Sequence, residues 1–169
     1  MKSLILFRHG PAGHSDETMP EDDAQRPLTP KGQKVSKNAA KMMRLMGARP
    51  TAVVTSPLDR AAQTAAIAAK VMGLEDGVTI CDALRPGTPI RDMIEALAPL
   101  FATTDTLLVV GHEPDLSHLA ATLVSGQPHA ALELRKAGFC LLMADELRAG
   151  KCAVLRALLN PRGLEGDAD

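Results

Sequence analysis

The stretch SLILFRHG, residues 3–10, decides the fold, because an apolar run ends abruptly at Arg8, His9 and Gly10. A short, continuous apolar run bounded by polar residues is typical of a strand buried on both faces, as in a parallel sheet. In open α/β sheets, ligands bind outside the carboxyl ends of the strands. The residues that directly follow each predicted strand are therefore the first place to look for a functional site.

Further segments of strand length follow, and helical patterns separate most of them. The predicted strands, besides residues 3–7, cover residues 52–55, 78–81, 106–110, 139–143 and 153–158. Helices are predicted to begin at Thr29-Pro30, in the segment 56–59, at Thr88-Pro89 and at Pro114. Pro99 is predicted to end the third helix.

This alternation of strands and helices predicts an α/β fold with three layers, α/β/α, around a mostly parallel sheet. The last two strands are separated by a turn around Gly150 and no helix, so we expect them to add an antiparallel edge.

Composition and charge fit one globular domain. The chain has 169 residues, of which 46% are apolar and 23% charged, and a formal net charge of −1. We expect a single domain over residues 1–159 and a polar tail over residues 160–169 that frays. The near-neutral charge argues against binding to nucleic acid or anionic lipid, and no apolar run is long enough to span a membrane. Because residues 1–7 are too short for a secretory signal, we expect a cytoplasmic protein.

Two arginines and two histidines are predicted to converge on one edge of the sheet. Arg8 and His9 follow the first strand, Arg60 lies in the first turn of the helix after the second, and His112 follows the fourth. Arginine presents a planar fork of donors that matches a phosphate, and helix N-termini also favour anions. One histidine can attack phosphorus while the other groups stabilise the transition state. Gly10 is expected to leave room for a ligand beside the backbone.

Each of these residues has an ordinary explanation when it is taken alone. A single histidine at a strand end is more often structural, and an arginine in a first helical turn is usually solvated. Their joint placement after three separate strands favours a functional site for phosphate chemistry.

With these motifs the chain resembles the histidine phosphatase superfamily, also described as phosphoglycerate-mutase-like. The resemblance rests on RHG at 8–10, TSPLDRAAQTA at 55–65 and VVGHEP at 109–114, and it extends from Lys2 to about Val124. It implies that His9 is the nucleophile, and that Arg8, Arg60 and His112 complete the catalytic phosphate pocket. The small size and the segment RPLTPKGQ at 26–33 are similar to the SixA-type phosphohistidine phosphatases, which implies that Arg26 also binds phosphate.

One departure from the family bears on the substrate. Many superfamily members that act on small molecules carry a glutamate acid after the third strand, whereas Arg85 stands in the matching stretch, residues 82–87. An alkoxide leaving group needs a proton donor, while an imidazole can leave already protonated. The missing acid therefore favours phosphohistidine as substrate, although Asp82, Glu113 or Asp115 remain alternative proton donors.

The remaining candidates are less specific. His112, Asp115 and His118 have a conceivable metal spacing but do not share one helical face, so we expect no metal and no other cofactor. His14 and the acidic residues of segment 15–23 lie in a polar loop that we interpret as solvated. The alternatives are that His14 approaches the pocket and that the acidic residues guide a partner.

The sequence thus predicts a phosphohistidine phosphatase with a signal-transduction role that acts through phospho-His9. Its expected partner is a phosphohistidine-bearing protein, and the family resemblance suggests a histidine phosphotransfer domain. Two alternatives stay open. One is a small-molecule phosphomonoesterase of the same superfamily, and the other is a non-catalytic module that binds phosphate or phosphoproteins.

Overall fold

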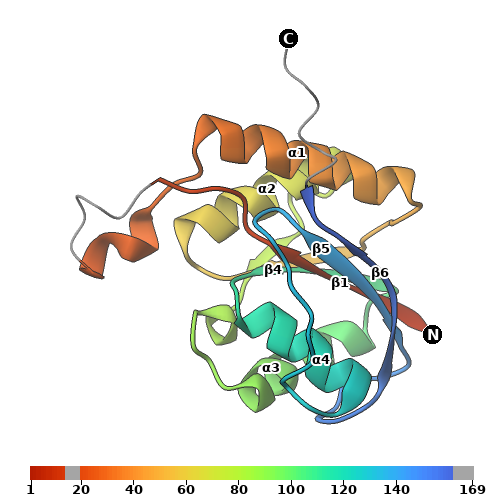
Figure 1. The fold of residues 1–169 in the computed structure, drawn as a ribbon. Coiled ribbons are helices and arrows are strands. Elements are labelled where there is room, and N and C mark those ends of the chain that lie inside the picture. The colour runs from red at the N-terminus through yellow and green to blue at the C-terminus, as the bar shows by residue number, and fades with distance from the viewer. Residues whose placement is uncertain (14–19, 162–169) are drawn as a thin grey trace.

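A six-stranded sheet forms the centre of the computed structural model, which describes residues 1–13 and 20–161. The strand order is β3-β2-β4-β1-β5-β6 (Figure 1). The strands are β1 (Lys2–Arg8), β2 (Ala52–Thr55), β3 (Val78–Ile80), β4 (Thr106–Gly111), β5 (Phe139–Ala144) and β6 (Ala153–Leu159). The first four are mutually parallel, whereas β5 runs antiparallel to both β1 and β6. The predicted mostly parallel sheet with an antiparallel edge is confirmed.

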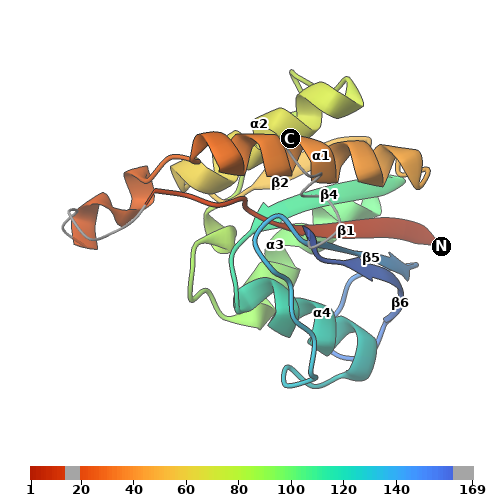
Figure 2. The same cartoon turned by 45° about the horizontal axis from the view of Figure 1, so that its top comes forward.

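Two helices cover each face of the sheet (Figures 1 and 2). The first pair is α1 (Pro30–Leu45) and α2 (Asp59–Met72), and the opposite pair is α3 (Ile90–Ala102) and α4 (Asp115–Ser125). Two short 3₁₀ segments, η1 (Pro20–Gln25) and η2 (Asp82–Leu84), connect them to the strands. None of the helices described here is long and apolar enough to cross a membrane.

The burial of β1 explains its unbroken apolar sequence. Leu4 and Leu6 face the core shared with α3 and α4, while Ile5 and Phe7 face the core shared with α1 and α2. All four side chains are at most 1% exposed, so both faces of the strand are buried. A central strand of a three-layer fold has no solvent side and therefore cannot alternate between apolar and polar residues.

One predicted helix boundary is wrong. Pro99 lies inside α3, which continues to Ala102. Proline removes one hydrogen bond, but few residues follow it, and the fully buried Phe101 anchors the last turn in the core. The helix after β2 begins at Asp59, so Arg60 is its second residue and lies in the first turn, as predicted.

The tail prediction falls mainly on residues 162–169, which lie outside the described part of the chain. Asn160, at the boundary, accepts a hydrogen bond from the Arg135 amide at 2.8 Å and donates one to the Glu133 carbonyl at 3.0 Å. These bonds connect the end of β6 to the loop that precedes β5.

Glycines let α1 approach the segment after β1 very closely. The first turn of α1 is capped by the Thr29 hydroxyl, which accepts the Gly32 N–H at 3.0 Å. A Cβ at Gly32 would lie 1.9 Å from the Pro11 carbonyl oxygen, and a Cβ at Gly10 would lie 2.3 Å from Ser36 Oγ. The N-terminal end of α1 therefore packs directly against the backbone that carries His9.

Gly32→Ala should destabilise the protein by about 2 kcal/mol or more, because the new methyl group overlaps backbone atoms. In an unobstructed helix the same change would stabilise by up to about 1 kcal/mol, so the sign of the effect is informative. Urea unfolding would measure it, with the exposed Lys34→Ala on the same helix as a near-neutral control. A stabilised Gly32→Ala variant would contradict the close packing.

Candidate active site

The backbone around His9 is fixed on both sides at the carboxyl end of β1. The His9 N–H donates to the Gly111 carbonyl at 3.1 Å, and the Ala137 N–H donates to the His9 carbonyl at 3.1 Å. The Gly10 N–H donates to the Thr64 hydroxyl of α2 at 3.1 Å. These bonds reach three different segments, so His9 occupies a rigid position although it follows the strand.

The orientation of the His9 ring frees one particular nitrogen. Nδ1 lies 2.7 Å from the Gly10 carbonyl oxygen. A carbonyl only accepts hydrogen bonds, so Nδ1 carries the proton in the neutral ring. Nε2 then keeps its lone pair, and a nucleophilic atom requires such a lone pair.

His112, which follows β4, lies beside His9, with ring centroids 5.1 Å apart and an angle of 57° between the ring planes. Its Nε2 lies 2.7 Å from Ser56 Oγ, which also accepts the Leu58 N–H at 3.3 Å. When the serine hydroxyl donates to Nε2, the ring proton is on Nδ1. That atom is buried and has no partner among the described residues, so it is available to a ligand oxygen.

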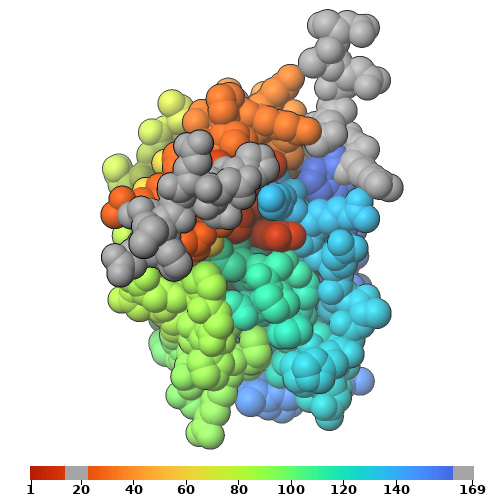
Figure 3. Space-filling view, turned by 60° about the vertical axis from the view of Figure 1, so that its left-hand side comes forward, coloured from red at the N-terminus to blue at the C-terminus, as the bar shows by residue number. Residues whose placement is uncertain are grey.

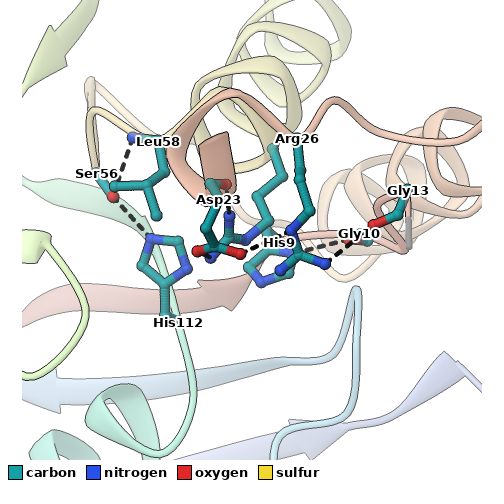
Figure 4. A network of polar contacts seen from close by, with 9 residues as sticks. His9, Gly10, Gly13, Asp23, Arg26, Ser56, Leu58 and His112 are labelled. Atoms are coloured by element: carbon teal, nitrogen blue, oxygen red, sulfur yellow. Dashed lines mark hydrogen bonds and ion pairs between the residues drawn. The ribbon is translucent and has the colours of Figure 1, made fainter. Parts of the chain in front are cut away.

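Three arginines surround the two histidines. Arg60 is 5% exposed and donates to the Asp23 carbonyl at 2.8 Å and to the Asp23 carboxylate at 3.2 Å. Arg26 binds the other carboxylate oxygen of Asp23 at 2.7 Å and donates to the Gly13 carbonyl at 2.9 Å. Arg8 donates to the Leu134 carbonyl at 2.9 Å. Figure 4 shows Asp23, Arg26 and the two histidines gathered at this point.

A pocket of about 220 Å³ opens at this place. Its lining residues are Arg8, His9, Ala12, Arg26, Arg60, Pro86, His112, Glu113 and Lys136. All the side chains that the sequence predicted for the site are among them. In Figure 3 a red patch from the start of the chain reaches the surface beside teal and light-blue segments from the second half of the sequence. The pocket is smaller than typical metabolite sites of roughly 300–1,000 Å³.

Gly10 has a different role from the predicted one. It does not line the pocket, and the space beside its α-carbon is filled by α1 rather than left for a ligand. Its contribution to the site is the carbonyl oxygen that holds Nδ1 of His9.

Sequence reasoning missed several residues of the site, including Asp23, Ser56 and Lys136. Lys136 belongs to the loop before β5. Because β5 is antiparallel to β1, its beginning lies at the same edge as the carboxyl ends of the parallel strands. The basic pair Arg135-Lys136, two residues ahead of this strand, was the available signal.

Burial and positive charge keep both histidines neutral. Burial lowers the pKa of His9 to about 3, and His112, Arg60 and Arg8 add to this effect against the opposing Gly10 hydrogen bond. Burial, and after it the positive charge of Arg60, lowers the pKa of His112 to about 4. Near neutral pH, His9 therefore presents an unprotonated nitrogen to the pocket.

The site is built for a small anion. The Nε atoms of Arg8 and Arg60 are buried without a partner among the described residues, as is Nδ1 of His112. Unsatisfied buried donors cost about 1–3 kcal/mol each, and an anion in the pocket would satisfy them. Asp23 partly balances the guanidinium charge. Burial raises the pKa of its carboxyl group, but the charges and hydrogen bonds of Arg60 and Arg26 lower this pKa by more, so the carboxylate is charged.

The described residues contain no cluster of three or more metal-ligating side chains. His118 contacts His129, with ring centroids 5.5 Å apart. His14 lies outside the described residues, so the structure does not place it relative to the pocket.

Acidification should destabilise the fold through these histidines. Between the ordinary histidine pKa of about 6.5 and the folded values of about 3 and about 4, the unfolded chain binds more protons. The free energy of unfolding should therefore fall, by on the order of a few kcal/mol, as the pH drops through this window. Urea unfolding from pH 7 to pH 4 measures this, and a His9→Asn/His112→Asn variant should show a weaker dependence. Equal pH dependence of the two proteins would contradict neutral buried histidines.

The sequence matches a known family and a known relative. The family model described as histidine phosphatase superfamily (branch 1) matches residues 4–85. An uncharacterized protein of Picosynechococcus sp. is 36% identical over 146 residues, which cover 86% of this chain and 87% of the relative.

Solved structures match over nearly the whole chain. The protein histidine phosphatase SixA complexed with tungstate has a TM-score of 0.82 at 22% identity, covering 96% of this chain and 99% of that one. A SixA protein from Nakamurella multipartitia, described as a putative phosphohistidine phosphatase, has a TM-score of 0.76 at 26% identity, covering 95% and 96%. A mycobacterial glucosyl-3-phosphoglycerate phosphatase has a TM-score of 0.68 at 18% identity, covering 95% and 99%. With the RHG motif, the paired histidines and this match of family and fold, the chain belongs to the histidine phosphatase superfamily.

Proposed function

We propose that this protein hydrolyses the phosphoryl group of protein phosphohistidine through a covalent phospho-His9 intermediate. The observation that carries the proposal is the fixed His9 ring. Its Nδ1 is bound to the Gly10 carbonyl at 2.7 Å, and the ring lines a pocket with Arg8, Arg60 and His112.

In the first step, Nε2 of His9 attacks phosphorus. The new N–P bond forms as the P–N bond to the substrate imidazole breaks, and the bond electrons leave with that imidazole. The guanidinium groups of Arg8 and Arg60 and the N–H of His112 stabilise the charge on the phosphoryl oxygens. His9 needs no base, because its neutral ring already has a free lone pair.

In the second step, water attacks the phosphorus of phospho-His9. An O–P bond forms as the bond to Nε2 breaks, and the electrons of that bond return to Nε2. Both protons of the water leave on dihydrogen phosphate, and neutral His9 is regenerated. The same donors stabilise this transition state, so one pocket serves both steps.

The positions and partners of the carboxyl groups near the pocket favour a substrate with an imidazole leaving group. Of the three alternative proton donors, only Glu113 lines the pocket, and both of its oxygens accept hydrogen bonds from Ser117. Asp82 pairs with the exposed Arg85, and Asp115 accepts the Gly87 N–H at 2.8 Å. A substrate whose leaving group can depart already protonated fits this pocket better than an alkyl phosphate.

The similarity to SixA structures agrees with this proposal, since SixA is named as a protein histidine phosphatase. A small-molecule phosphomonoesterase is the second candidate, and the match to glucosyl-3-phosphoglycerate phosphatase is the observation that favours it. The small volume of the pocket favours the first, because about 220 Å³ holds a phosphoryl group and a ring but little more. A non-catalytic binding module would not require the free nitrogen of His9.

His9→Ala should lower turnover of a histidine-phosphorylated protein by at least about a thousandfold, because no other group can form the intermediate. Phosphate release measures the loss, and rapid acid-free quenching with labelled substrate should trap phosphate on wild-type protein only. The exposed His129→Ala variant, which removes a histidine outside the pocket, should behave as wild type. Turnover of an aryl phosphate alone would select the small-molecule alternative, and phosphate binding without any turnover would select the binding module.

Glu113→Gln should change kcat for phosphohistidine less than about threefold, because the leaving imidazole needs no acid from the enzyme. The amide keeps the oxygen that accepts the Ser117 N–H, so α4 should begin as before. The same assay on Glu133→Gln, an exposed position, controls for charge. A loss of a hundredfold or more would identify Glu113 as a general acid and favour phosphate monoesters as substrates.

A further inference from the structure

A second concave surface lies apart from the active-site pocket, between α1 and α2. It is a groove of about 690 Å³, which we call the α1–α2 groove, and it shares no residue with the pocket. Its lining residues are Pro30, Gln33, Lys34, Lys37, Lys41, Arg44, Ile67, Lys70 and Val71. The two helices run side by side along one face of the sheet (Figures 1 and 2).

The groove is strongly basic although the protein is not. The helix α1 contains Lys31, Lys34, Lys37, Lys41 and Arg44 and no acidic residue, whereas the whole chain has a net charge of −1. Among the residues that the structure describes, no aspartate or glutamate lines the groove. Such a concentration of one charge sign on a near-neutral protein attracts partners of the opposite sign.

The lysine charges of the groove are not neutralised by ion pairs within the described structure. Lys34, Lys37, Lys41 and Lys70 are exposed and form no ion pair with the described residues. Arg44 donates to the Val71 carbonyl of α2 at 3.2 Å, which ties the two walls together. The groove therefore keeps its shape while its lysine ammonium groups remain available to a partner.

One end of the groove lies next to the active site. The Thr29 N–H, directly before α1, donates to the Pro11 carbonyl at 3.0 Å, two residues after His9. On the other wall, Arg60 reaches the pocket from the start of α2, and Lys70 follows ten residues later, about 15 Å along the helix. A protein held at the pocket by one side chain can thus reach the lysines with its neighbouring surface.

We propose that the α1–α2 groove docks an acidic helix or loop of the protein whose phosphohistidine enters the pocket. This inference rests on the proposed function. Since the pocket holds little beyond a phosphoryl group and a ring, recognition of a whole protein needs a second contact, and the groove supplies one of defined charge. Single-stranded nucleic acid fits less well, because the chain has no Trp or Tyr and only three Phe for base stacking.

The test compares two double charge reversals that alter net charge equally, Lys41→Glu/Lys70→Glu in the groove and Lys151→Glu/Arg156→Glu elsewhere. The control residues are exposed, and Lys151 precedes β6 at the sheet edge opposite the pocket.

The substrates are a histidine-phosphorylated carrier protein with acidic residues beside its histidine, and phosphoramidate as a small substrate. The groove variant should raise KM for the carrier about tenfold with kcat unchanged, and should leave turnover of phosphoramidate unchanged. The control variant should match wild type on both.

Neutralising the carrier's acidic residues to amides should remove the difference between the groove variant and wild type. An unchanged KM in the groove variant, or equal effects of the two double variants, would overturn the docking proposal. Groove-dependent binding of anionic vesicles or duplex DNA without binding of the carrier would overturn it as well.

Binding of the carrier to a His9→Ala background separates this proposal from the proposed function. If wild type does not dephosphorylate the carrier but binding weakens about tenfold in the groove variant alone, the function fails and the docking surface stands. If the carrier is dephosphorylated but its binding does not depend on the groove charges, the function stands and the docking surface fails. Absence of any binding overturns the docking surface.

Discussion

The hydrogen bond from Nδ1 of His9 to the Gly10 carbonyl is the constraint on which the chemistry of the site depends. It selects the tautomer with a free Nε2, and burial lowers the pKa of the ring to about 3, so this nitrogen stays unprotonated. The bond requires the backbone of residues 9 and 10 to be held still. The sheet provides this, since β1 lies between β4 and β5 and the amides and carbonyls beyond its end are paired with Gly111 and Ala137.

The same backbone is held from the side by α1. Gly10 and Gly32 have no side chain where the two segments cross, so the start of the helix rests on the backbone that follows β1. A hydrogen bond from the Gly10 N–H to Thr64 adds a contact with α2. The rigid part of the site therefore depends on small residues and backbone atoms, while the arginines provide the charge that meets the ligand.

Much of the fold and of the site was predictable from local sequence. Continuous apolar runs marked buried strands, Pro and Thr marked helix starts, and the rule that sites follow strand ends brought Arg8, Arg60 and His112 together with His9. The misses have a common cause. Lys136 enters the pocket because β5 reverses direction, and Pro99 is tolerated because Phe101 is buried, so both depend on tertiary packing that local patterns do not contain. Asp23 belongs to the site only because η1 folds back onto Arg60.

The distribution of charge links the pocket to its surroundings. Within the site, Asp23 offsets part of the charge of Arg26 and Arg60, so the three guanidinium groups of the pocket are not all without a counter-charge. An incoming phosphoryl group must compete with this carboxylate, which limits how much affinity the pocket alone gives to free phosphate. In the α1–α2 groove no acidic side chain from the described part of the chain lies among the lining lysines. Charge is thus offset at the reaction centre and in excess beside it. Under the two proposals, the groove would select the partner protein, and the pocket would carry out only the phosphohistidine chemistry.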